Sequence, residues 1–83
     1  MNMKYFIYIL RCSDDTLYTG ITTDLERRLD EHNNSDKGAK YTKLRRPVDL
    51  VYSEESEDRS SASKREYAIK KLSRKEKLEL INV

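Results

Sequence analysis

The fold is decided by two apolar segments, Tyr5-Phe6-Ile7-Tyr8-Ile9-Leu10-Arg11 and Leu17-Tyr18-Thr19-Gly20-Ile21. The polar cluster Ser13-Asp14-Asp15-Thr16 lies between them. Aromatic and β-branched residues favour strands, and a polar cluster between two such segments favours a turn. The pattern therefore predicts a β-hairpin over residues 5–21. Its first strand is apolar on both faces, which predicts a strand that is central in the sheet or covered by helices on both sides.

Two tyrosines make the register of this hairpin informative. Tyr8 and Tyr18 share one face only if paired positions sum to an even number, as when Leu10 pairs with Tyr18. That register requires a loop of odd length around Asp14. A two-residue turn at Asp14-Asp15 would instead place the two tyrosines on opposite faces.

A helix and a third strand are expected after the hairpin. Thr23 and Glu26 have the spacing of a capping box, which predicts a helix that ends at about residue 32 or 33. Pro47 then precedes residues 48–53, whose alternating pattern predicts a strand.

The last third of the chain predicts two more helices. Ser60 or Ser61 is expected to cap the first, and Ser73 with Glu76 forms a second capping box that opens a short final helix. The expected fold is a single α+β domain over residues 1–83, with a small three-stranded antiparallel sheet flanked by helices in the order ββαβαα.

Composition limits what the chain can do. Its 83 residues are 39% charged and 36% hydrophobic, which suits one small domain and excludes a large multi-substrate enzyme. One cysteine excludes an internal disulfide, and one histidine without a Cys/His cluster excludes structural zinc. No apolar run approaches the ~20 residues of a membrane helix, and no secretory pattern is found. We therefore expect a cytoplasmic protein without a membrane partner.

Charge is unevenly distributed along the chain. Residues 59–83 carry 8 basic and 3 acidic side chains, whereas residues 1–58 carry 9 basic and 12 acidic ones. Residues 37–46 hold five positive charges, no negative charge and one tyrosine, and their candidate nucleic-acid contacts are Lys37, Lys40, Tyr41, Lys43, Arg45 and Arg46. Cations bind phosphates and a ring stacks on a base, so this stretch suits nucleic acid. On charge alone, a solvated basic loop explains it equally well.

Ionisable side chains also occur on the apolar faces of two predicted helices. A helical wheel places Arg28 and His32 beside Leu29, and it places Glu66 beside Ile69. Uncompensated charges are costly in a small core, so Arg28 and Glu66 either pair with each other or line a cleft. In a cleft, the guanidinium would suit phosphate oxygens and the carboxylate would suit Mg²⁺.

Several separate motifs together resemble the GIY-YIG nuclease superfamily. The resemblance runs from about residue 4 to residue 80 and rests on Ile7-Tyr8, Tyr18-Thr19-Gly20, Thr23-Asp24-Leu25-Glu26-Arg27-Arg28, His32 and Glu66. It implies a GIY-YIG-like fold and a small stand-alone bacterial member. The chain departs from the pattern at Phe6, at Thr19, and at Ile21, where some members carry a lysine. The last departure predicts the loss of one phosphate contact and weak turnover.

The resemblance also implies roles for individual residues. Arg28, eight positions after Gly20, matches the catalytic arginine, and Glu66 matches the glutamate that would bind Mg²⁺ or Mn²⁺. Tyr8, Tyr18 and His32 would complete the catalytic set. Tyr18 is the first candidate to orient or deprotonate the attacking water, with Tyr8 and His32 as alternatives or helpers.

Three further expectations concern residues around this set. An unperturbed phenol has a pKa near ~10, so a nearby cation would have to lower it for base catalysis at neutral pH. Gly20 is expected to let the backbone turn sharply after the second strand. Tyr52 and Tyr67 are expected to be packing residues.

The function implied by the resemblance is a metal-dependent endonuclease that hydrolyses phosphodiester bonds in DNA. No added DNA-reading module is recognised, so we expect low sequence specificity and recognition of single-stranded, branched or damaged DNA, as in repair or recombination. RNA is not excluded. The main alternative is a non-catalytic nucleic-acid-binding module that uses residues 37–46 and the basic C-terminal helices. A protein-interaction adaptor is a third hypothesis.

Overall fold

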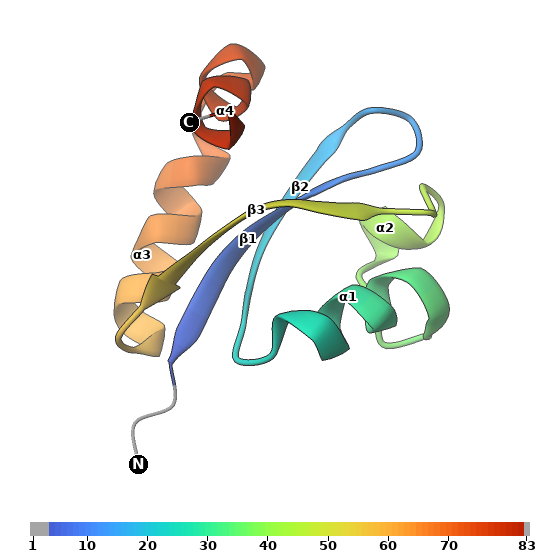
Figure 1. Cartoon of the computed structure of the whole chain (residues 1–83), viewed down its shortest axis with the longest axis horizontal. Helices are drawn as coiled ribbons and strands as arrows, with labels where there is room; N and C mark the ends of the chain where they lie inside the picture. Colours follow the sequence, from blue (N-terminus) through green and yellow to red (C-terminus); the bar gives the residue numbers. More distant parts are fainter. Residues whose placement is uncertain (1–3, 83) are drawn as a thin grey trace.

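The computed structural model describes residues 4–82, which form three strands and four helices (Figure 1). In chain order these are β1 (Tyr5–Arg11), β2 (Leu17–Thr22), α1 (Leu25–Asn34), α2 (Lys40–Lys43), β3 (Asp49–Ser56), α3 (Arg59–Lys70) and α4 (Arg74–Ile81). The α+β class and the order ββαβαα are confirmed. The structure adds α2, a single turn of helix inside the stretch that the sequence predicts as a basic loop.

The sheet is antiparallel with the strand order β2-β1-β3, so β1 is its central strand. In the β1–β2 hairpin, Leu10 pairs with Tyr18 and Tyr8 pairs with Gly20. The predicted register is therefore confirmed, and Tyr8 and Tyr18 share one face. The connecting turn includes Asp15 with a φ of 68°, a left-handed conformation that Asp tolerates better than most residues.

Helices cover both faces of the sheet, as the doubly apolar β1 predicts. Ile7 and Ile9 pack with Ala62 and Ile69 of α3 on one face, where Leu80 and Ile81 of α4 join them. On the other face, Tyr8, Leu10, Cys12 and Val48 form a second cluster against Leu25 and Leu29 of α1. Figure 1 shows α3 and α4 on one side of the sheet and α1 and α2 on the other. Among residues 4–82, no helix is both long enough and apolar enough to cross a membrane.

Two of the three predicted helix caps are wrong by one or more residues. Asp24, not Thr23, caps α1, and its carboxylate accepts a hydrogen bond from the Arg27 amide at 3.0 Å. Asp58, ahead of both predicted serines, caps α3 through the Ser61 amide at 2.8 Å. In each case an aspartate carboxylate caps the helix in place of the predicted hydroxyl group. Aspartate is as good an N-cap residue as serine and a better one than threonine. The capping box of α4 is confirmed in full.

Candidate active site

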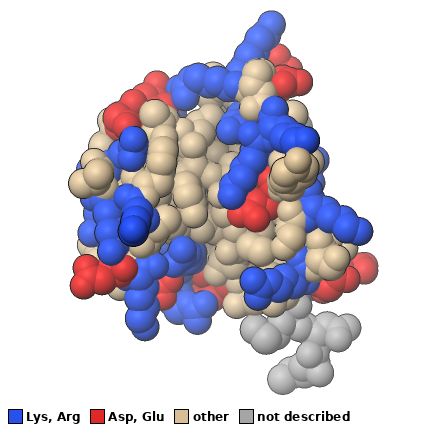
Figure 2. Space-filling view, turned by 180° about the vertical axis from the view of Figure 1, so that it is seen from behind, with Lys and Arg blue, Asp and Glu red and all other residues tan. Residues whose placement is uncertain are grey.

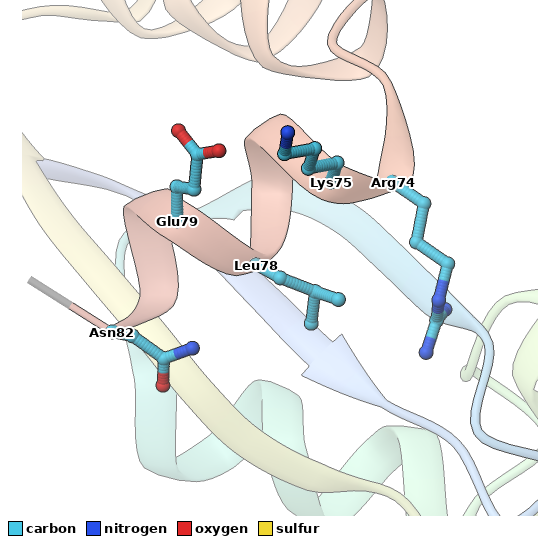
Figure 3. A pocket seen from close by; sticks show the side chains of 5 residues that line it. All are labelled: Arg74, Lys75, Leu78, Glu79 and Asn82. Carbon is cyan, nitrogen blue, oxygen red and sulfur yellow. The ribbon is translucent and has the colours of Figure 1, made fainter.

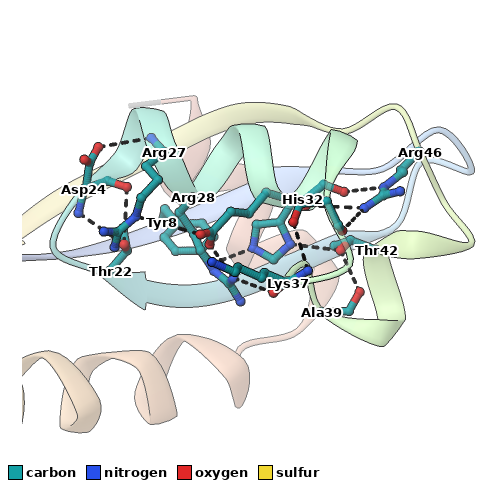
Figure 4. A network of polar contacts seen from close by, with 12 residues as sticks. Tyr8, Thr22, Asp24, Arg27, Arg28, His32, Lys37, Ala39, Thr42 and Arg46 are labelled. Atoms are coloured by element: carbon teal, nitrogen blue, oxygen red, sulfur yellow. Dashed lines mark hydrogen bonds and ion pairs between the residues drawn. The ribbon is translucent and has the colours of Figure 1, made fainter.

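A buried hydrogen bond between β1 and α1 forms the centre of the candidate site. The Tyr8 hydroxyl lies 2.8 Å from Nε2 of His32, and Nδ1 of the same ring lies 2.9 Å from Oγ1 of Thr42 (Figure 4). His32 and Thr42 are fully buried and Tyr8 nearly so. The chain of contacts continues to the carbonyl of Ala39, which accepts a hydrogen bond from Thr42 at 2.9 Å. One relay thus connects the central strand, α1 and α2.

The last contact fixes the direction of the others. Since the Thr42 hydroxyl gives its proton to the Ala39 carbonyl, its oxygen accepts a hydrogen bond from Nδ1–H of His32. A neutral imidazole with its proton on Nδ1 has a free lone pair on Nε2. The Tyr8 hydroxyl therefore donates to His32, and the remaining lone pairs of its oxygen stay available to another donor.

Both rings of this pair are held in their neutral forms. Burial, assisted by the positive charge of Arg28, lowers the pKa of His32 to about 4. Burial also raises the pKa of Tyr8 to about 12, although the nearby Arg28 opposes that change. The expectation that a cation lowers the tyrosine pKa below its usual value does not hold for Tyr8 in the protein alone, because desolvation outweighs the charge.

Gly20 makes the position of Tyr8 possible. A Cβ atom at residue 20 would lie 2.5 Å from the Tyr8 hydroxyl oxygen and 2.7 Å from Cζ of the ring. The described glycines have no positive φ, so the expectation of a sharp turn at Gly20 is wrong. The residue lies inside β2, opposite Tyr8, and its missing side chain leaves space for the tyrosine ring to cross the strand.

The ring of Tyr18 contacts that of His32 edge to face but makes a different connection. Its ring centroid lies 5.2 Å from that of His32 and 6.4 Å from that of Tyr8. Tyr18 also stacks on Tyr41 of α2, with 6.0 Å between the ring centroids. The Arg45 guanidinium lies 3.8 Å from the Tyr41 ring centroid. Tyr18 therefore joins the buried pair to the aromatic ring of the basic stretch.

Arg28 extends over this cluster from α1. Its Nη1 donates to the Glu31 carboxylate and to the Lys37 carbonyl, each at 2.9 Å. The guanidinium also interacts with the Tyr8 hydroxyl, which contributes to the raised pKa of Arg28, and its side chain is 25% exposed. The arginine is held at one corner of its planar fork and keeps other donors available for a ligand.

Glu66 approaches the cluster from α3. Its negative charge is close enough to Tyr8 to contribute to the raised pKa of that hydroxyl. Its ion pair is with Lys70 at 3.3 Å, and Arg28 pairs with Glu31, so the alternative that Arg28 and Glu66 pair with each other is wrong. Tyr8 thus lies within the electrostatic range of one carboxylate from the opposite layer.

The donor set fits a divalent ion that keeps most of its water. Within residues 4–82 no group of three or more His, Cys, Asp or Glu side chains could enclose a metal. Glu66 offers one hard oxygen ligand, which is 23% exposed and, within residues 4–82, forms an ion pair only with the neighbouring Lys70. Mg²⁺ is commonly bound by one or two carboxylates together with waters and substrate phosphate oxygens.

The basic residues of the stretch 37–46 divide into two groups. Arg46 donates to the carbonyls of Glu31, His32 and Ser35, so it caps the C-terminal end of α1 (Figure 4). Arg45 pairs with Asp14 at 3.0 Å as well as covering Tyr41. The other three side chains form no ion pair within the part of the chain that the structure describes, and they are Lys37, Lys40 and Lys43.

Thr42 was not identified from the sequence as a residue of the site, and the expectation that Tyr67 is a packing residue is wrong. Thr42, which orients His32, gives no local signal because its role depends on a contact ten residues away. Tyr67, expected to pack in the core, is 61% exposed on α3, with the Lys71 ammonium 4.4 Å from its ring centroid. Tyr52, by contrast, is partly buried against the core as expected.

One face of the molecule carries basic side chains on both sides of an uncharged strip (Figure 2). A separate hollow of about 640 Å³ lies along α4 and shares no residue with the site (Figure 3). Its lining residues are Arg74, Lys75, Leu78, Glu79 and Asn82.

Comparison with known proteins shows the family to which the chain belongs. The family model described as the GIY-YIG catalytic domain matches residues 4–79. A UPF0213 protein of Desulfotalea psychrophila is 62% identical over 93% of this chain and 70% of its own length, and one of Staphylococcus saprophyticus is 56% identical over 95% of both chains. The NMR structure of the UPF0213 protein BH0048 of Bacillus halodurans matches 96% of this chain and 84% of its own, with 44% identity and a TM-score of 0.61. The chain therefore belongs to the GIY-YIG family, a family of nucleases, and its relatives are UPF0213 proteins.

Proposed function

We propose that this protein is a metal-dependent endonuclease that hydrolyses phosphodiester bonds in DNA. The observation that carries the proposal is the Tyr8 hydroxyl, which donates to a neutral His32, lies beside Arg28 and is within reach of the charge of Glu66. A tyrosine buried only as a packing residue needs one hydrogen-bond partner and no surrounding charges.

The proposed chemistry begins with a proton transfer along the relay. The attacking water gives a proton to the Tyr8 oxygen as the Tyr8 proton moves to Nε2 of His32, and the resulting hydroxide bonds to phosphorus. The bond from phosphorus to the 3′ oxygen breaks, and the released oxygen takes a proton from solvent. Tyr8 suits this role better than Tyr18, the first candidate from the sequence, because Tyr8 is the one hydrogen-bonded to His32. Tyr18 would then position the ring of His32 through their edge-to-face contact.

Because Tyr8 and His32 are both neutral in the protein alone, the substrate must contribute the charge that makes proton transfer to His32 favourable. In the protein alone, burial and the charge of Arg28 disfavour the protonated form of His32, and they lower its pKa to about 4. A bound phosphate would bring negative charge to Arg28 and offset its repulsion of the imidazolium, which raises the proton affinity of His32. The relay would therefore become effective when a phosphodiester is bound.

Arg28 and Glu66 would act on the phosphate. The free donors of Arg28 would stabilise the negative charge that develops on the phosphate oxygens, and this kind of stabilisation is commonly worth ~10²–10³ in rate. A Mg²⁺ or Mn²⁺ ion held by Glu66 would supply positive charge for the leaving 3′ oxygen.

The proposed substrates are single-stranded, branched or damaged DNA, as in repair or recombination. The support is the nature of the cationic groups around the site, which would bind phosphates and bases without reading a sequence. Lys37, Lys40, Lys43 and the Arg45–Tyr41 pair are the proposed contacts on the side of α2. RNA shares the same backbone chemistry and belongs in the test.

The test is cleavage of labelled single-stranded, duplex and branched DNA, and of a single-stranded RNA, with Mg²⁺ or Mn²⁺. Arg28→Ala and Glu66→Gln should each lose at least about a hundredfold in rate. Arg11→Ala and Glu79→Gln, matched changes at exposed positions away from the site, should cut normally. Salt-sensitive binding without any cutting would refute the enzyme and favour a binding module.

A further inference from the structure

A second concave site lies next to Arg28, at the end of β2. It is a pocket of about 380 Å³ lined by Tyr5, Ile21, Thr22, Thr23, Arg27, Arg28, Glu31 and Arg59. It lies where the last residues of β2 meet the start of α1 and the start of α3. Its volume falls in the range of sites that hold small ligands or parts of larger ones.

The charge of this pocket favours an anion. Three arginines line it against one carboxylate, Glu31. That carboxylate is shared, because it pairs with Arg28 at 2.9 Å and with Arg27 at 3.9 Å. Concave surfaces with one excess sign of charge concentrate the counter-ion.

Arg59 is the least engaged of the three arginines. It is exposed at the first position of α3, and its side chain forms no ion pair or hydrogen bond within residues 4–82. An arginine that lines a pocket without a carboxylate partner has its whole planar fork available for phosphate oxygens. The hydroxyl group of Thr23, which lines the same pocket, adds one donor for a phosphate oxygen, whereas the Thr22 hydroxyl already donates to the Asp24 carbonyl at 3.3 Å.

The position of Arg59 relates the pocket to the candidate active site. Arg59 precedes Glu66 by seven residues, two turns of helix, so both lie on the same flank of α3. Their separation along the helix axis is roughly 10 Å, which spans about three phosphates of a stacked strand. Arg28 belongs to both places, because it lines this pocket and lies beside Tyr8.

We propose that this pocket is a phosphate-binding subsite, in which Arg59 and Arg27 hold a phosphate of the substrate strand that lies up to about three nucleotides from the one being cut. The inference rests on the proposed function, and it adds a contact that is separate from the chemistry. The role of Arg59 is to position the strand, so its loss should weaken binding while the rate at saturating substrate changes little. Arg28, which contacts the reacting phosphate, should show the opposite pattern.

The test compares Arg59→Gln with Arg11→Gln, which makes the same charge change at an exposed position at the opposite end of β1. Binding of a fluorescent single-stranded 20-nucleotide DNA is measured without divalent metal, so that nothing is cut. Arg59→Gln should weaken binding about tenfold and lower the slope of log affinity against log salt by about 1. Arg11→Gln should leave both values unchanged.

A second measurement uses inorganic phosphate alone. In a ¹H–¹⁵N NMR titration, phosphate should shift the amides of Ile21, Thr22 and Thr23, and the shifts should vanish in Arg59→Gln, whose unchanged spectrum elsewhere reports correct folding. Normal DNA binding by Arg59→Gln, in a protein whose cutting is lost in Arg28→Ala, would overturn this inference and leave the proposed function standing. A protein that neither cuts nor binds nucleic acid, yet shows the phosphate shifts, would overturn the proposed function and keep the anion site.

Discussion

Acidification should destabilise this protein through one residue, His32. It is the single histidine of the chain and it is fully buried. The pKa of its ring is lowered from 6.5 to about 4 in the folded protein, by burial first and by Arg28 second. The unfolded chain therefore binds a proton below pH 6.5 that the folded protein does not bind until about pH 4.

The sign and size of the effect follow from these two values. Stability rises with pH wherever the unfolded state binds more protons, so the free energy of unfolding should fall as the pH decreases through 6.5. Between pH 7.5 and pH 5.0 the loss amounts to about 2 kcal/mol. A domain of this size has roughly 4–12 kcal/mol in total, so the loss should be easily measured.

Urea unfolding followed by circular dichroism, at constant ionic strength and at several values between pH 5.0 and 7.5, measures this dependence. His32→Gln removes the titrating ring, so its stability should be nearly independent of pH in the same window. If that variant does not fold, the imidazole proton resonances of the unaltered protein report the same pKa by NMR. A titration midpoint near 6.5, or a free energy of unfolding that stays flat down to pH 5.0, would refute the buried neutral histidine and the relay built on it.

Two further predictions concern β2. Gly20→Ala places a Cβ against the ring of Tyr8, so it should lower the free energy of unfolding by about 1–3 kcal/mol and disrupt the Tyr8–His32 hydrogen bond. Urea unfolding measures the first effect, and the chemical shifts of the His32 ring measure the second. A variant in which both are unchanged would contradict the close approach of Gly20 and Tyr8. Thr19 is buried, and its hydroxyl has no hydrogen-bond partner within the described chain. Thr19→Val should therefore keep or raise the free energy of unfolding, by up to about 2 kcal/mol, and a clear loss of stability would reveal a partner that the structure does not contain.

The main features of the fold were predictable because they depend on local patterns. A strand with apolar residues on both faces must be covered twice, and β1 separates the two core clusters as that rule requires. The parity of the hairpin register followed from placing Tyr8 and Tyr18 on one face. The helix caps were less certain, since Thr23 and Asp24 are adjacent and both are good capping residues. Nothing in the local sequence decides between them.

The candidate site was predictable only in part. Arg28, His32 and Glu66 could be found because a helical wheel places each of them at the edge of an apolar stripe. The roles of Thr42 and Gly20 depend on contacts between segments distant in the sequence. Tyr67 was assigned to the core on its residue type, although its place on the wheel of α3, far from Ile69, favours the exposure that the structure has.

The small size of the chain makes its candidate site part of its core. Tyr8, His32 and Thr42 are buried, and the relay they form joins the sheet to α1 and α2. A substitution in the relay removes a buried hydrogen bond, so loss of activity there would also accompany loss of stability. Arg28 and Glu66 are different, because their side chains are 25% and 23% exposed and their ion pairs are with neighbours on the same helix. A loss of cutting in Arg28→Ala or Glu66→Gln with unchanged unfolding can therefore be attributed to chemistry, and this is why the proposed nuclease is best tested at those two positions.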